Sequence, residues 1–485
     1  MGTGEVQKLK KTMKPLLSFS LLALLPLPLF SSGPADLSLS PDKAVKVTLA
    51  EDPFSISQKA IYKPKPQAAH DSSDADDEVE FGWNVSKWDP SRMVATDNIV
   101  LFWAPGFGSN ISTAPDYIQV RENGDTIRHN MKVDLANLLD KLESFYSFFY
   151  NDLAFVKPGT KADKYKMMVM LDYSLEGTAF GGAYDDVIGA LWIAPNRVQD
   201  ENLNCIAHEL GHSFQTQISC DNEGAGWGGA GFYEMASQWM LWQVNPEWQR
   251  DERFHLDAFS DLTHKAFLHI DNIYHSPYVL ELWGEKHGRP IIAELFRRGE
   301  VGEDPVMTYK KLTGISQKEF NDEMYHNYAR LVNWDIDRVR ENTRGYTDIW
   351  HTQLEDAGSG WQRVAAANCP ENYGFNVIPV KLPEPGKKLT VNFRGEAGKK
   401  GYYSMNTDKA GWRYGFVAVD ADGKEYYGEM NDKAKGKLTF ENPADSNIEK
   451  LWLVVMGAPT EHWRNVDGPD NPGDAQWPYS LKFSY

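Results

Sequence analysis

Residues 205–215 read "CIAHELGHSFQ", in which two histidines stand four positions apart and Glu209 directly follows the first. In an α-helix, positions four apart lie ~40° apart around the axis and ~6 Å along it, so the rings of His208 and His212 can reach one metal ion. Glu209 lies a further ~100° around the helix from His208, which places its carboxylate beside the metal. There it can take a proton from a water on the metal. The pattern predicts a metal site with two histidine ligands and Glu209 as general base.

The flanking residues favour the helix that this geometry requires. Ile206, Leu210 and Phe214 recur at helical spacing and form an apolar stripe, while both histidines lie on another face. We therefore expect a helix over residues 202–217. Zn2+ is the predicted metal, because imidazole suits it and it tolerates an open fourth position for water. Two histidines on an amphipathic helix without a metal are the alternative.

Two histidines leave the site incomplete, so a third ligand has to come from elsewhere in the chain. The extended pattern HExxHxxGxxH is excluded, because this chain has Gln215 and Ile218 where that pattern needs glycine and histidine. A glutamate from a second helix is the remaining common solution. The carboxylates downstream are Asp221, Glu223, Glu234 and Glu247.

Glu234 is the candidate that the sequence favours. Asp221 and Glu223 fall in a glycine-rich stretch, "CDNEGAGWGGAG", which indicates a turn between two helices. Glu234 falls inside "FYEMASQWMLWQV", a helix apolar on nearly every side, where an unpaired carboxylate is strongly unfavourable. Metal ligation removes that penalty, and the spacing of 234 − 212 = 22 residues allows one turn and an antiparallel return helix. A structural salt bridge is the alternative role for Glu234.

Working outward from the motif, we predict an α+β domain over residues 81–365 with a mixed sheet. The segments that precede the motif are strand-like runs at 98–103, 165–173 and 188–195 and a helical run at 131–150. Beyond the motif the chain is mainly helical to about residue 340. Within that part, Ser316 and Glu319 predict a capping box at the start of a helix.

An all-β sandwich is predicted for residues 370–485. Short strands there are separated by turn residues, and Asp422-Gly423 is a strong hairpin signal. Because the domain has its own strands and turns, we expect the part from about residue 375 to fold alone. Three tryptophans could form a glycan-binding platform or pack in the core: Trp412, Trp463 and Trp477.

The N-terminus predicts export. Residues 1–35 hold a basic segment, an apolar run and small residues suited to cleavage, which is typical of a signal peptide, and Met13 is an alternative start. Residues 36–80 are polar and end in the acidic run "DSSDADDEVE", which indicates a solvated linker. The predicted location is secreted, periplasmic or at the cell surface.

Charge and cysteine content restrict the partners and the covalent framework. The formal net charge of −18 makes nucleic acid or an anionic membrane an unfavourable partner. With three cysteines, the chain is not a disulfide scaffold. Cys205 and Cys220 are too far apart along a helix to pair. Either Cys220 pairs with Cys369, or all three thiols are free.

With these residues in view, the chain resembles the gluzincin branch of zinc metallopeptidases, which combine HExxH with a later glutamate. "HELGHSFQ" and "YEMASQW" are particularly similar to the mucin-degrading, enhancin-like peptidases of gut bacteria. More broadly, residues ~95–485 resemble an uncharacterised family of secreted bacterial proteins that join a zincin-like domain to a C-terminal β domain. The segments that carry this second resemblance are "DNIVLFW", "GALWIAP", "YHSPYVLELWGEKHG", "YGFNVIPV" and "LWLVVMGAP".

The resemblance implies a zincin-like fold with His208, His212 and Glu234 as zinc ligands and Glu209 as general base and acid. It also implies a tyrosine from a later helix that stabilises the oxyanion, for which Tyr274 takes the equivalent place. His275 and Tyr278 are near enough to compete for that role. The strand before the metal helix, within "GGAYDDVIGALWIAP", would line the cleft and bind substrate backbone; a plain core strand is the alternative.

The function that follows is a secreted zinc-dependent peptidase that hydrolyses proteins or glycoproteins, with a possible glycan contact through the C-terminal domain. A non-catalytic glycan- or protein-binding surface protein on a zincin scaffold is the second hypothesis. A zinc hydrolase of a non-peptide bond is the third, since fold and motif do not separate it from the first.

Overall fold

The computed structural model describes residues 59–63, 88–175, 179–224, 227, 231–343, 345–464 and 474–485. All of them belong to one compact unit, Leu39–Tyr485. The predicted signal peptide, nearly all of the predicted linker and the alternative start at Met13 lie outside the described residues. No helix among the described residues is long and apolar enough to cross a membrane.

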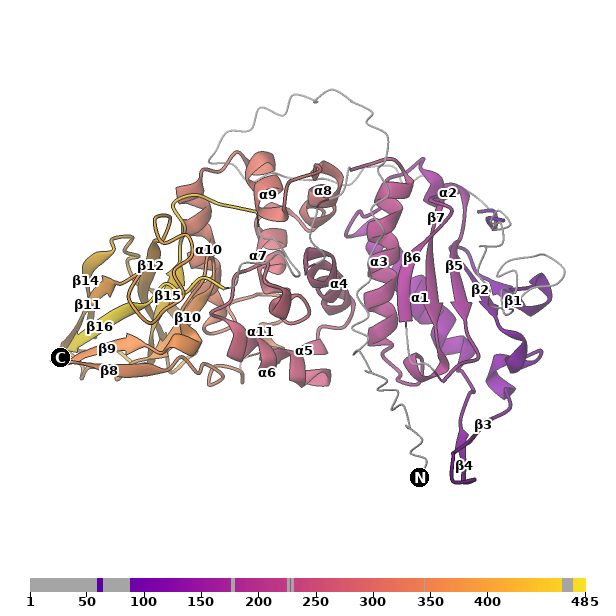
Figure 1. The fold of residues 1–485 in the computed structure, drawn as a ribbon, viewed down its shortest axis with the longest axis horizontal. Coiled ribbons are helices and arrows are strands. Elements are labelled where there is room, and N and C mark those ends of the chain that lie inside the picture. The colour runs from indigo at the N-terminus through magenta and orange to yellow at the C-terminus, as the bar shows by residue number, and fades with distance from the viewer. Residues whose placement is uncertain are drawn as a thin grey trace, which may run out of the picture. The chain divides into compact units, whose positions relative to one another are not determined.

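A mixed five-stranded sheet forms the first layer, in the order β1-β2-β5-β7-β6 (Figure 1). Its strands are β1 (Met93–Ala95), β2 (Ile99–Trp103), β5 (Met167–Leu171), β6 (Ala179–Tyr184) and β7 (Ile188–Ile193). The central strands β2, β5 and β7 are parallel, and β1 and β6 are antiparallel edge strands. Every residue of β2 and β5 is buried, as expected for parallel strands that are covered on both faces. The strands predicted at 98–103, 165–173 and 188–195 are thus present, and β6 joins the sheet through a tight turn at Asp185 and Asp186.

Two long helices pack against this sheet, α1 (Leu135–Asn151) and α3 (Asn204–Cys220). The rings of Tyr146 and Phe149 on α1 contact Phe214 on α3, with centroids 5.1 and 5.5 Å away. Helix α3 lies directly on β6 and β7, where a side chain at Gly181 would overlap the backbone of α3. The close approach places the HELGH motif at the edge of the sheet.

The middle of the chain is helical, as predicted, and follows α3. Its helices are α4 (Gly231–Val244), α5 (Trp248–Asp251), α6 (Arg253–Leu262), α7 (Tyr278–His287), α8 (Ile291–Arg298), α9 (Pro305–Thr313), α10 (Gln317–Leu331) and α11 (Arg340–Thr343). The capping box of Ser316 and Glu319 is formed at the start of α10. Outside these layers lie the short helix α2 (Lys161–Lys164) and a hairpin of β3 (Tyr117–Val120) and β4 (Thr126–His129).

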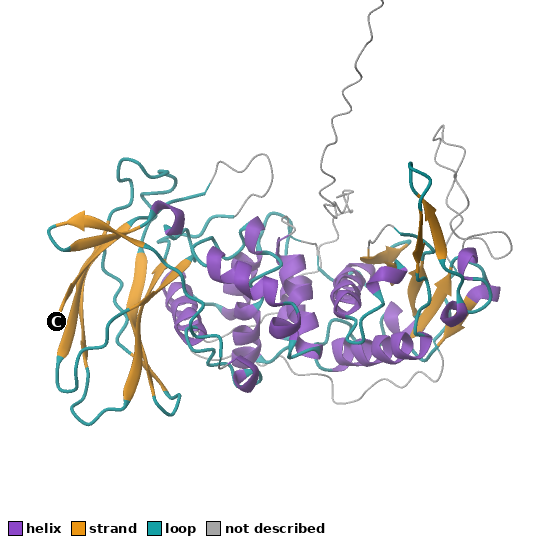
Figure 2. Ribbon diagram, turned by 90° about the horizontal axis from the view of Figure 1, so that it is seen from below, coloured by secondary structure: helices purple, strands orange, loops and turns teal. Residues whose placement is uncertain are grey.

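The C-terminal part consists of two antiparallel sheets that enclose a second hydrophobic core, so it is a β-sandwich (Figure 2). One sheet has the order β10-β15-β12-β13, with β10 (Phe375–Pro379), β12 (Trp412–Asp420), β13 (Glu425–Tyr427) and β15 (Ile448–Gly457). The other has the order β14-β11-β16-β9-β8, with β8 (Leu354–Gly358), β9 (Trp361–Val364), β11 (Lys388–Gly395), β14 (Lys435–Glu441) and β16 (Tyr479–Ser484). The hairpin turn predicted at Asp422-Gly423 connects β12 and β13.

The sandwich begins earlier in the chain than residue 370, where the sequence analysis placed its start. Strands β8 and β9, which that boundary leaves in the preceding domain, pair with each other and join the five-stranded sheet through β16. They are separated from β10 by a non-repetitive segment around Cys369, and this break in the strand pattern resembles a domain boundary. The sandwich therefore starts at Leu354.

The sandwich also shares a core with the helices. Val377, Val417, Trp452 and Val454 project from the outer face of the four-stranded sheet into the core that the helical part builds. Helix α10 packs on this face, and Arg413 on β12 forms an ion pair with Asp322 on α10 at 2.6 Å. The two parts are therefore held together by apolar burial.

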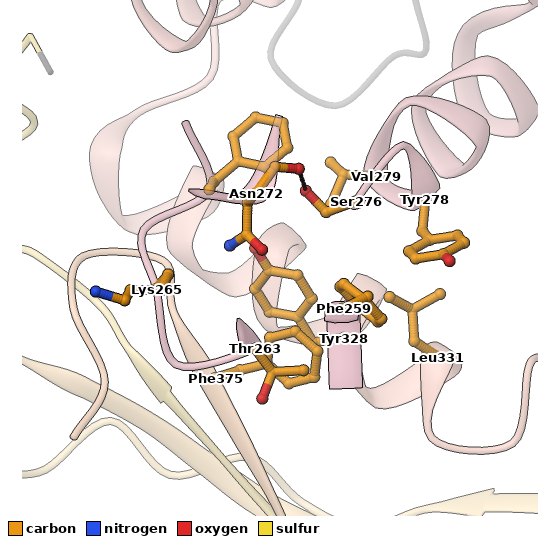
Figure 3. Close-up of a pocket in the computed structure, with 11 residues that line it drawn as sticks. Phe259, Thr263, Lys265, Asn272, Ser276, Tyr278, Val279, Tyr328, Leu331 and Phe375 are labelled. Carbon is orange, nitrogen blue, oxygen red and sulfur yellow. Dashed lines mark hydrogen bonds between the residues drawn. The ribbon is translucent and has the colours of Figure 1, made fainter. Parts of the chain in front are cut away.

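A small cavity lies at this junction, between α6, α7, α10 and β10 (Figure 3). Phe259, Tyr328 and Phe375 line it, and the space holds about one water molecule. It is too small for a peptide or a sugar, and none of the predicted metal ligands lines it.

The structure decides two expectations from the sequence, one for the cysteines and one for the tryptophans. All three cysteines are free, which is the second of the alternatives given for them. Trp412 and Trp477 are buried in the sandwich core, and the ring of Trp463 packs on Trp477 with centroids 6.0 Å apart. Trp412 and Trp477 pack inside the sandwich and Trp463 is half-buried against it, so the three do not form an exposed platform.

Candidate metal centre

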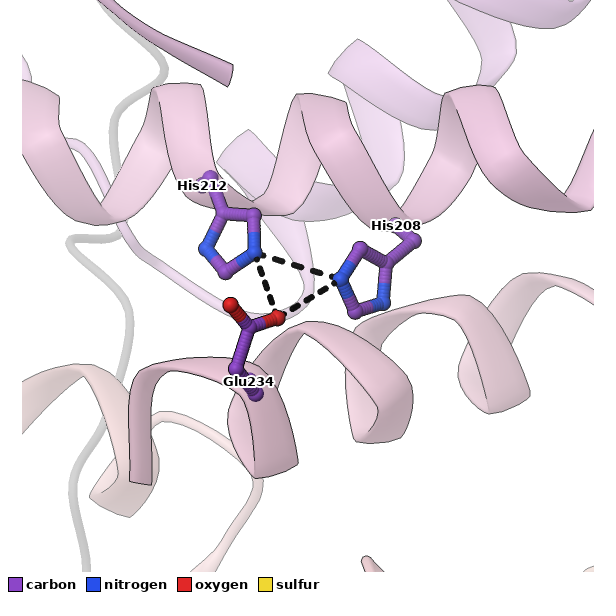
Figure 4. A group of neighbouring side chains, drawn as sticks. All are labelled: His208, His212 and Glu234. Carbon is purple, nitrogen blue, oxygen red and sulfur yellow. Dashed lines mark hydrogen bonds and ion pairs between the residues drawn. The ribbon is translucent and has the colours of Figure 1, made fainter. Parts of the chain in front are cut away.

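Three side chains from two helices converge on one point beside the sheet (Figure 4). His208 and His212 project from α3, and Glu234 projects from the first turn of α4. The two Nε2 atoms are 3.2 Å apart, and Glu234 Oε2 lies 3.1 Å from His208 Nε2 and 3.0 Å from His212 Nε2. His208 and Glu234 are buried and His212 is half-buried. Gly211 permits this arrangement, because a side chain there would press on Ser237 of α4.

The triangle of donor atoms is slightly smaller than that of an occupied tetrahedral zinc site. Two ligands that each stand ~2.1 Å from a tetrahedral zinc ion are ~3.4 Å apart. The observed separations of 3.0 to 3.2 Å are within a few tenths of an ångström of that value. The chemistry also suits zinc, since two imidazole nitrogens and one carboxylate oxygen leave a fourth position for water.

A glutamine on α4 selects which ring nitrogen of His208 carries the hydrogen. The amide nitrogen of Gln238 donates to the backbone oxygen of Tyr274 at 2.9 Å, so its amide oxygen is turned towards His208. That oxygen lies 2.8 Å from His208 Nδ1. Because an amide oxygen only accepts, Nδ1 carries the hydrogen and Nε2 presents a lone pair to the convergence point.

The same arrangement is repeated at His212. Gln215 donates through its amide nitrogen to the backbone oxygen of Tyr233 and to Ser237 Oγ, both at 3.0 Å. Its amide oxygen lies 3.1 Å from His212 Nδ1, which therefore carries the hydrogen. Ligating histidines in metalloproteins commonly donate their other ring nitrogen in this way, which orients the ring and raises its basicity.

Three acceptors that face one another require a positive charge between them. A single proton satisfies one contact: burial lowers the pKa of His212, but the hydrogen bond and charge of Glu234 outweigh it and raise the pKa to about 9. Burial opposes ionisation of Glu234, yet the two adjacent histidines hold its pKa far below the usual range. A proton on His212 leaves His208 Nε2 directed at Glu234 with no hydrogen between them. A divalent cation at the convergence point satisfies all three atoms at once.

Glu209 is held beside this group by the sheet. The backbone N–H of Gly181 on the edge strand β6 donates to Glu209 Oε2 at 3.0 Å. Since Gly181 has no side chain, α3 approaches closely enough for this bond to form. Glu209 is not one of the converging ligands and its side chain is partly exposed, which suits a group that exchanges protons with a substrate.

Tyr274 is the tyrosine that the structure places at the site. Its ring centroid lies 6.1 Å from that of His208, and the side chain is partly exposed. Burial, followed by the charge of Glu234, raises the pKa of Tyr274, so its hydroxyl stays protonated and can donate a hydrogen bond. The two competitors lie elsewhere: His275 Nδ1 contacts His255 Nδ1 at 2.8 Å, and Tyr278 is fully buried in the core.

The other downstream carboxylates are engaged away from the centre. Asp221 accepts the backbone N–H of Lys161 at 2.9 Å. Glu223 forms an ion pair with Arg297 at 2.7 Å, and Glu247 pairs with Arg250. Glu234 is therefore the carboxylate that joins the two histidines.

Sequence reasoning did not single out the residues that orient the ligands: Gln215, Ser237, Gln238 and Gly181. A signal for two of them was present. Ser237 and Gln238 follow Glu234 by three and four positions in an otherwise apolar helix, so they share its face. Gly181 left no such signal, because its contact with Glu209 depends on how α3 lies across the sheet.

A second group of potential ligands lies where the helical part meets the sandwich: His269, Glu371 and Asp474. Lys265 already supplies a cation there through an ion pair with Asp474, and His269 Nε2 lies 2.8 Å from the same carboxylate. Burial, followed by the charge of Asp474, raises the pKa of Glu371 to about 8. The group is satisfied as an ion-pair cluster.

Comparison with known proteins assigns the chain to a family without a described activity. Residues 53–485 match the family of unknown function DUF6055, and the chain belongs to that family. No curated protein matches the sequence.

Several solved structures are each similar to 27–30% of this chain. A Yersinia pseudotuberculosis-derived mitogen is 10% identical, covers 28% of this chain and 86% of its own, and has a TM-score of 0.17. A family 16 carbohydrate-binding module is 8% identical over 30% of this chain and 95% of its own, with a TM-score of 0.16. A family 22 carbohydrate-binding module of Clostridium thermocellum Xyn10B is 12% identical over 27% and 77%, with a TM-score of 0.16. TM-scores this low support no inference about activity.

Proposed function

We propose that this protein is an exported zinc-dependent peptidase of the gluzincin type, with a zincin-like catalytic domain. One observation carries the proposal: two histidine Nε2 lone pairs, each enforced by a glutamine on the far side of its ring, converge with a buried carboxylate oxygen. A salt bridge alone does not need both rings held in this tautomer. The exported location rests on the sequence of residues 1–35.

The residues around the centre have distinct parts in peptide hydrolysis. When bound, zinc supplies a Lewis acid that activates a water and polarises the scissile carbonyl. Glu209 accepts the proton of the attacking water at its carboxylate and delivers it to the leaving amine. Tyr274 donates its hydroxyl hydrogen to the developing oxyanion.

The edge of the sheet provides a place for an extended substrate. Strand β6 pairs with β7 on one side and ends the sheet on the other, next to Glu209. An edge strand presents backbone groups that an extended peptide can pair with. In this proposal, a peptide aligned on β6 passes the converging ligands. Within "GGAYDDVIGALWIAP", β6 is an edge strand and β7 an internal strand, so in this proposal β6 is the part that lines the cleft.

The proposal is tested first by metal content. The purified mature chain should hold one zinc per molecule by mass spectrometry, and His208→Ala, His212→Ala and Glu234→Ala should each abolish it. Glu223→Ala serves as the matched control, because Glu223 is engaged by Arg297 and should leave zinc in place. A wild-type chain that binds no zinc contradicts the proposal.

Substitution of Glu209, the proposed general base, tests the proposed activity. Glu209→Gln should retain zinc and lose ~10²–10⁴-fold in cleavage rate, because a general base is removed and no ligand is. Tyr274→Phe should lose ~10²–10³-fold, as expected for one oxyanion donor, with zinc unchanged. Cleavage is read from a proteome-wide profile of peptides released by wild type and by each variant.

The same experiment separates the two other functions. A scaffold that binds glycan or protein without catalysis would release no peptides even with zinc bound. A hydrolase of a non-peptide bond would bind zinc, spare proteins, and lose activity on its ester or amide substrate in Glu209→Gln. Nothing in the geometry favours either over the peptidase.

A further inference from the structure

The outer face of the five-stranded sheet carries basic side chains in an otherwise acidic chain. Alternate residues of β11, β14 and β16 are buried in the sandwich core, among them Val391, Phe393, Leu438 and Leu481. The residues between them therefore project from the opposite face. We call this surface the basic face and define it by five cations: Arg363, Arg394, Lys435, Lys437 and Lys482.

Strand register arranges these cations in rows across the sheet. In one row, Lys435 on β14 stands opposite Arg394 on β11, and Arg394 opposite Ser480 on β16. Ser480 stands opposite Arg363 on β9, and the row ends with Glu355 on β8, opposite Arg363. In the next row, Lys437 stands opposite Asn392, and Asn392 opposite Lys482. Cations two strands apart are separated by ~9.6 Å, twice the strand spacing.

The basic face holds fewer carboxylates than cations: Glu355 on β8 stands opposite Arg363, and Glu441 forms an ion pair with Lys388 at 2.8 Å. Glu396 accepts from Arg363 at 2.6 Å and from Arg394 at 2.7 Å, so one negative charge serves two guanidinium groups. Lys482 donates to the backbone oxygen of Ser359, and it forms no ion pair with a carboxylate in the part of the chain that the structure describes. Among the described residues, no carboxylate pairs with Lys435 or Lys437, and both side chains are exposed. The basic face keeps a net positive charge, whereas the whole chain has −18.

The cations are held in place by their neighbours. The guanidinium of Arg394 lies over the ring of Trp361, 4.6 Å from its centroid. Asn392 lies within the second row, between Lys437 and Lys482, and Thr390 follows in the next row; both offer hydrogen-bonding groups. Because Arg394 is fixed between Trp361 and Glu396, it loses little freedom when a ligand binds.

We propose that the basic face binds a linear anionic polysaccharide, with carboxylate or sulfate groups on its sugars. Charge complementarity supports this occupant, since cations repeat at a spacing comparable to a disaccharide and are interleaved with hydroxyl and amide groups that match sugar hydroxyls. A lipid bilayer fits less well, because the basic face offers one large apolar side chain, Trp361. A nucleic acid fits less well, because the acidic remainder of the chain repels a continuous phosphate backbone. This binding is independent of the metal centre.

The proposal is tested on the full mature chain by titration calorimetry with hyaluronan, which carries carboxylates, and chondroitin sulfate, which adds sulfates. Neutral dextran, a DNA duplex of equal charge and phosphatidylglycerol vesicles are the comparison probes. Binding to at least one acidic polysaccharide is expected, and it should weaken as salt rises, because exposed charges are screened. The combined variant Lys435→Ser, Lys437→Ser and Lys482→Ser should bind roughly tenfold less tightly or worse, since several exposed ion pairs are lost together.

A charge-matched control removes three exposed lysines that lie off the basic face: Lys132→Ser, Lys164→Ser and Lys424→Ser. It should bind as wild type does, and Glu209→Gln should too, which keeps this test separate from the peptidase. Equal loss in both triple variants would show that total charge and not the basic face drives binding. Absence of binding to both polysaccharides, or tighter binding to DNA or vesicles, would overturn the proposal.

Discussion

At the scale of single residues, the metal centre depends as much on amides as on ligands. Gln238 and Gln215 have fixed orientations because their nitrogens donate to backbone oxygens, at 2.9 and 3.0 Å. Each glutamine thereby forces the hydrogen of a histidine onto Nδ1. Without them, either imidazole could place its hydrogen on Nε2 and turn a donor towards the metal position. If the centre binds a cation as proposed, we expect the glutamines to determine its affinity.

This dependence gives a prediction for Gln238. Replacing it with leucine keeps the size of the side chain and removes the acceptor at His208 Nδ1, so zinc affinity should fall ~10–100-fold, as is usual when such partners are lost. A competition titration against a fluorescent chelator measures the change. Gln249→Leu is the matched control, because Gln249 is equally buried and lies away from the centre. Unchanged affinity in Gln238→Leu would show that the tautomer is set by other contacts.

At the scale of elements, the geometry of the site depends on the close packing of α3 on β6 and β7. Gly181 and Gly189 stand under the backbone of α3, and Ser213 Oγ donates to the backbone oxygen of Ala190 at 2.7 Å. Gln217 accepts the N–H of Gly189 at 2.7 Å. The helix is thus bonded to the sheet along its length, and this fixes the height of the ligands above the edge strand.

The glycine contact can be tested directly. Gly181→Ala would introduce a methyl group that overlaps the backbone oxygen of Glu209, so α3 has to shift away from the sheet. We expect a loss of ~1–3 kcal/mol in the free energy of unfolding, which is typical of overpacking, measured by urea denaturation. Cleavage should fall too, because the N–H that positions Glu209 moves. Gly345→Ala is the control: its side chain would meet open space and should change stability by less than ~0.5 kcal/mol.

At the scale of the whole molecule, the sandwich and the helical part share one apolar interface. Strand β12 is buried at every position and β15 at most positions, because one face packs in the sandwich and the other on the helices. Polar anchors fix the same junction: Asn321 on α10 donates to the backbone oxygen of Pro459 at 2.8 Å. The expectation that the part from about residue 375 folds alone is not supported by this arrangement, since β8 and β9 would be missing and an apolar face would be exposed.

A fragment of residues 351–485 tests this interface. It contains both sheets but exposes Val377, Val417 and Trp452, so we expect it to aggregate where the full mature chain is soluble. Size-exclusion chromatography with light scattering distinguishes the two. Changing these three residues to threonine in the fragment should restore a soluble species. A wild-type fragment that is monomeric and unfolds cooperatively would show that the interface contributes little.

The junction also predicts a dependence of stability on pH through Glu371. Glu371 accepts the N–H of Ala266 and lies near Lys265, and burial, followed by the charge of Asp474, raises its pKa from 4.5 to about 8. A carboxyl whose folded pKa is raised contributes stability that is complete below its unfolded pKa and is lost as pH rises through the folded value. Thermal stability should therefore fall between about pH 4.5 and about pH 8. In Glu371→Gln, which cannot ionise, that part of the decline in Tm should disappear; a parallel profile for both proteins would contradict the assignment.

The sequence by itself predicted most of the elements and the convergence of His208, His212 and Glu234. Helical spacing places His208 and His212 on one face of α3 whatever surrounds it, and an isolated carboxylate in an apolar helix needs a cation, which singled out Glu234. The alternation and turn residues of the last hundred residues were enough to predict a sandwich, because these signals are local. The continuous apolar runs "YGFVAV" and "LWLVVM" are also typical of strands that are buried on both faces.

Tertiary structure alone decided the relations between elements that are distant in the chain. The contact of Gly181 with Glu209, the role of Gln238 at His208 and the membership of β8 and β9 in the sandwich each depend on packing between distant segments. The basic face is of the same kind: its cations are scattered from residue 363 to residue 482, and strand register alone brings them together. Local periodicity records which side of an element is buried, but it holds no information about which other element covers that side.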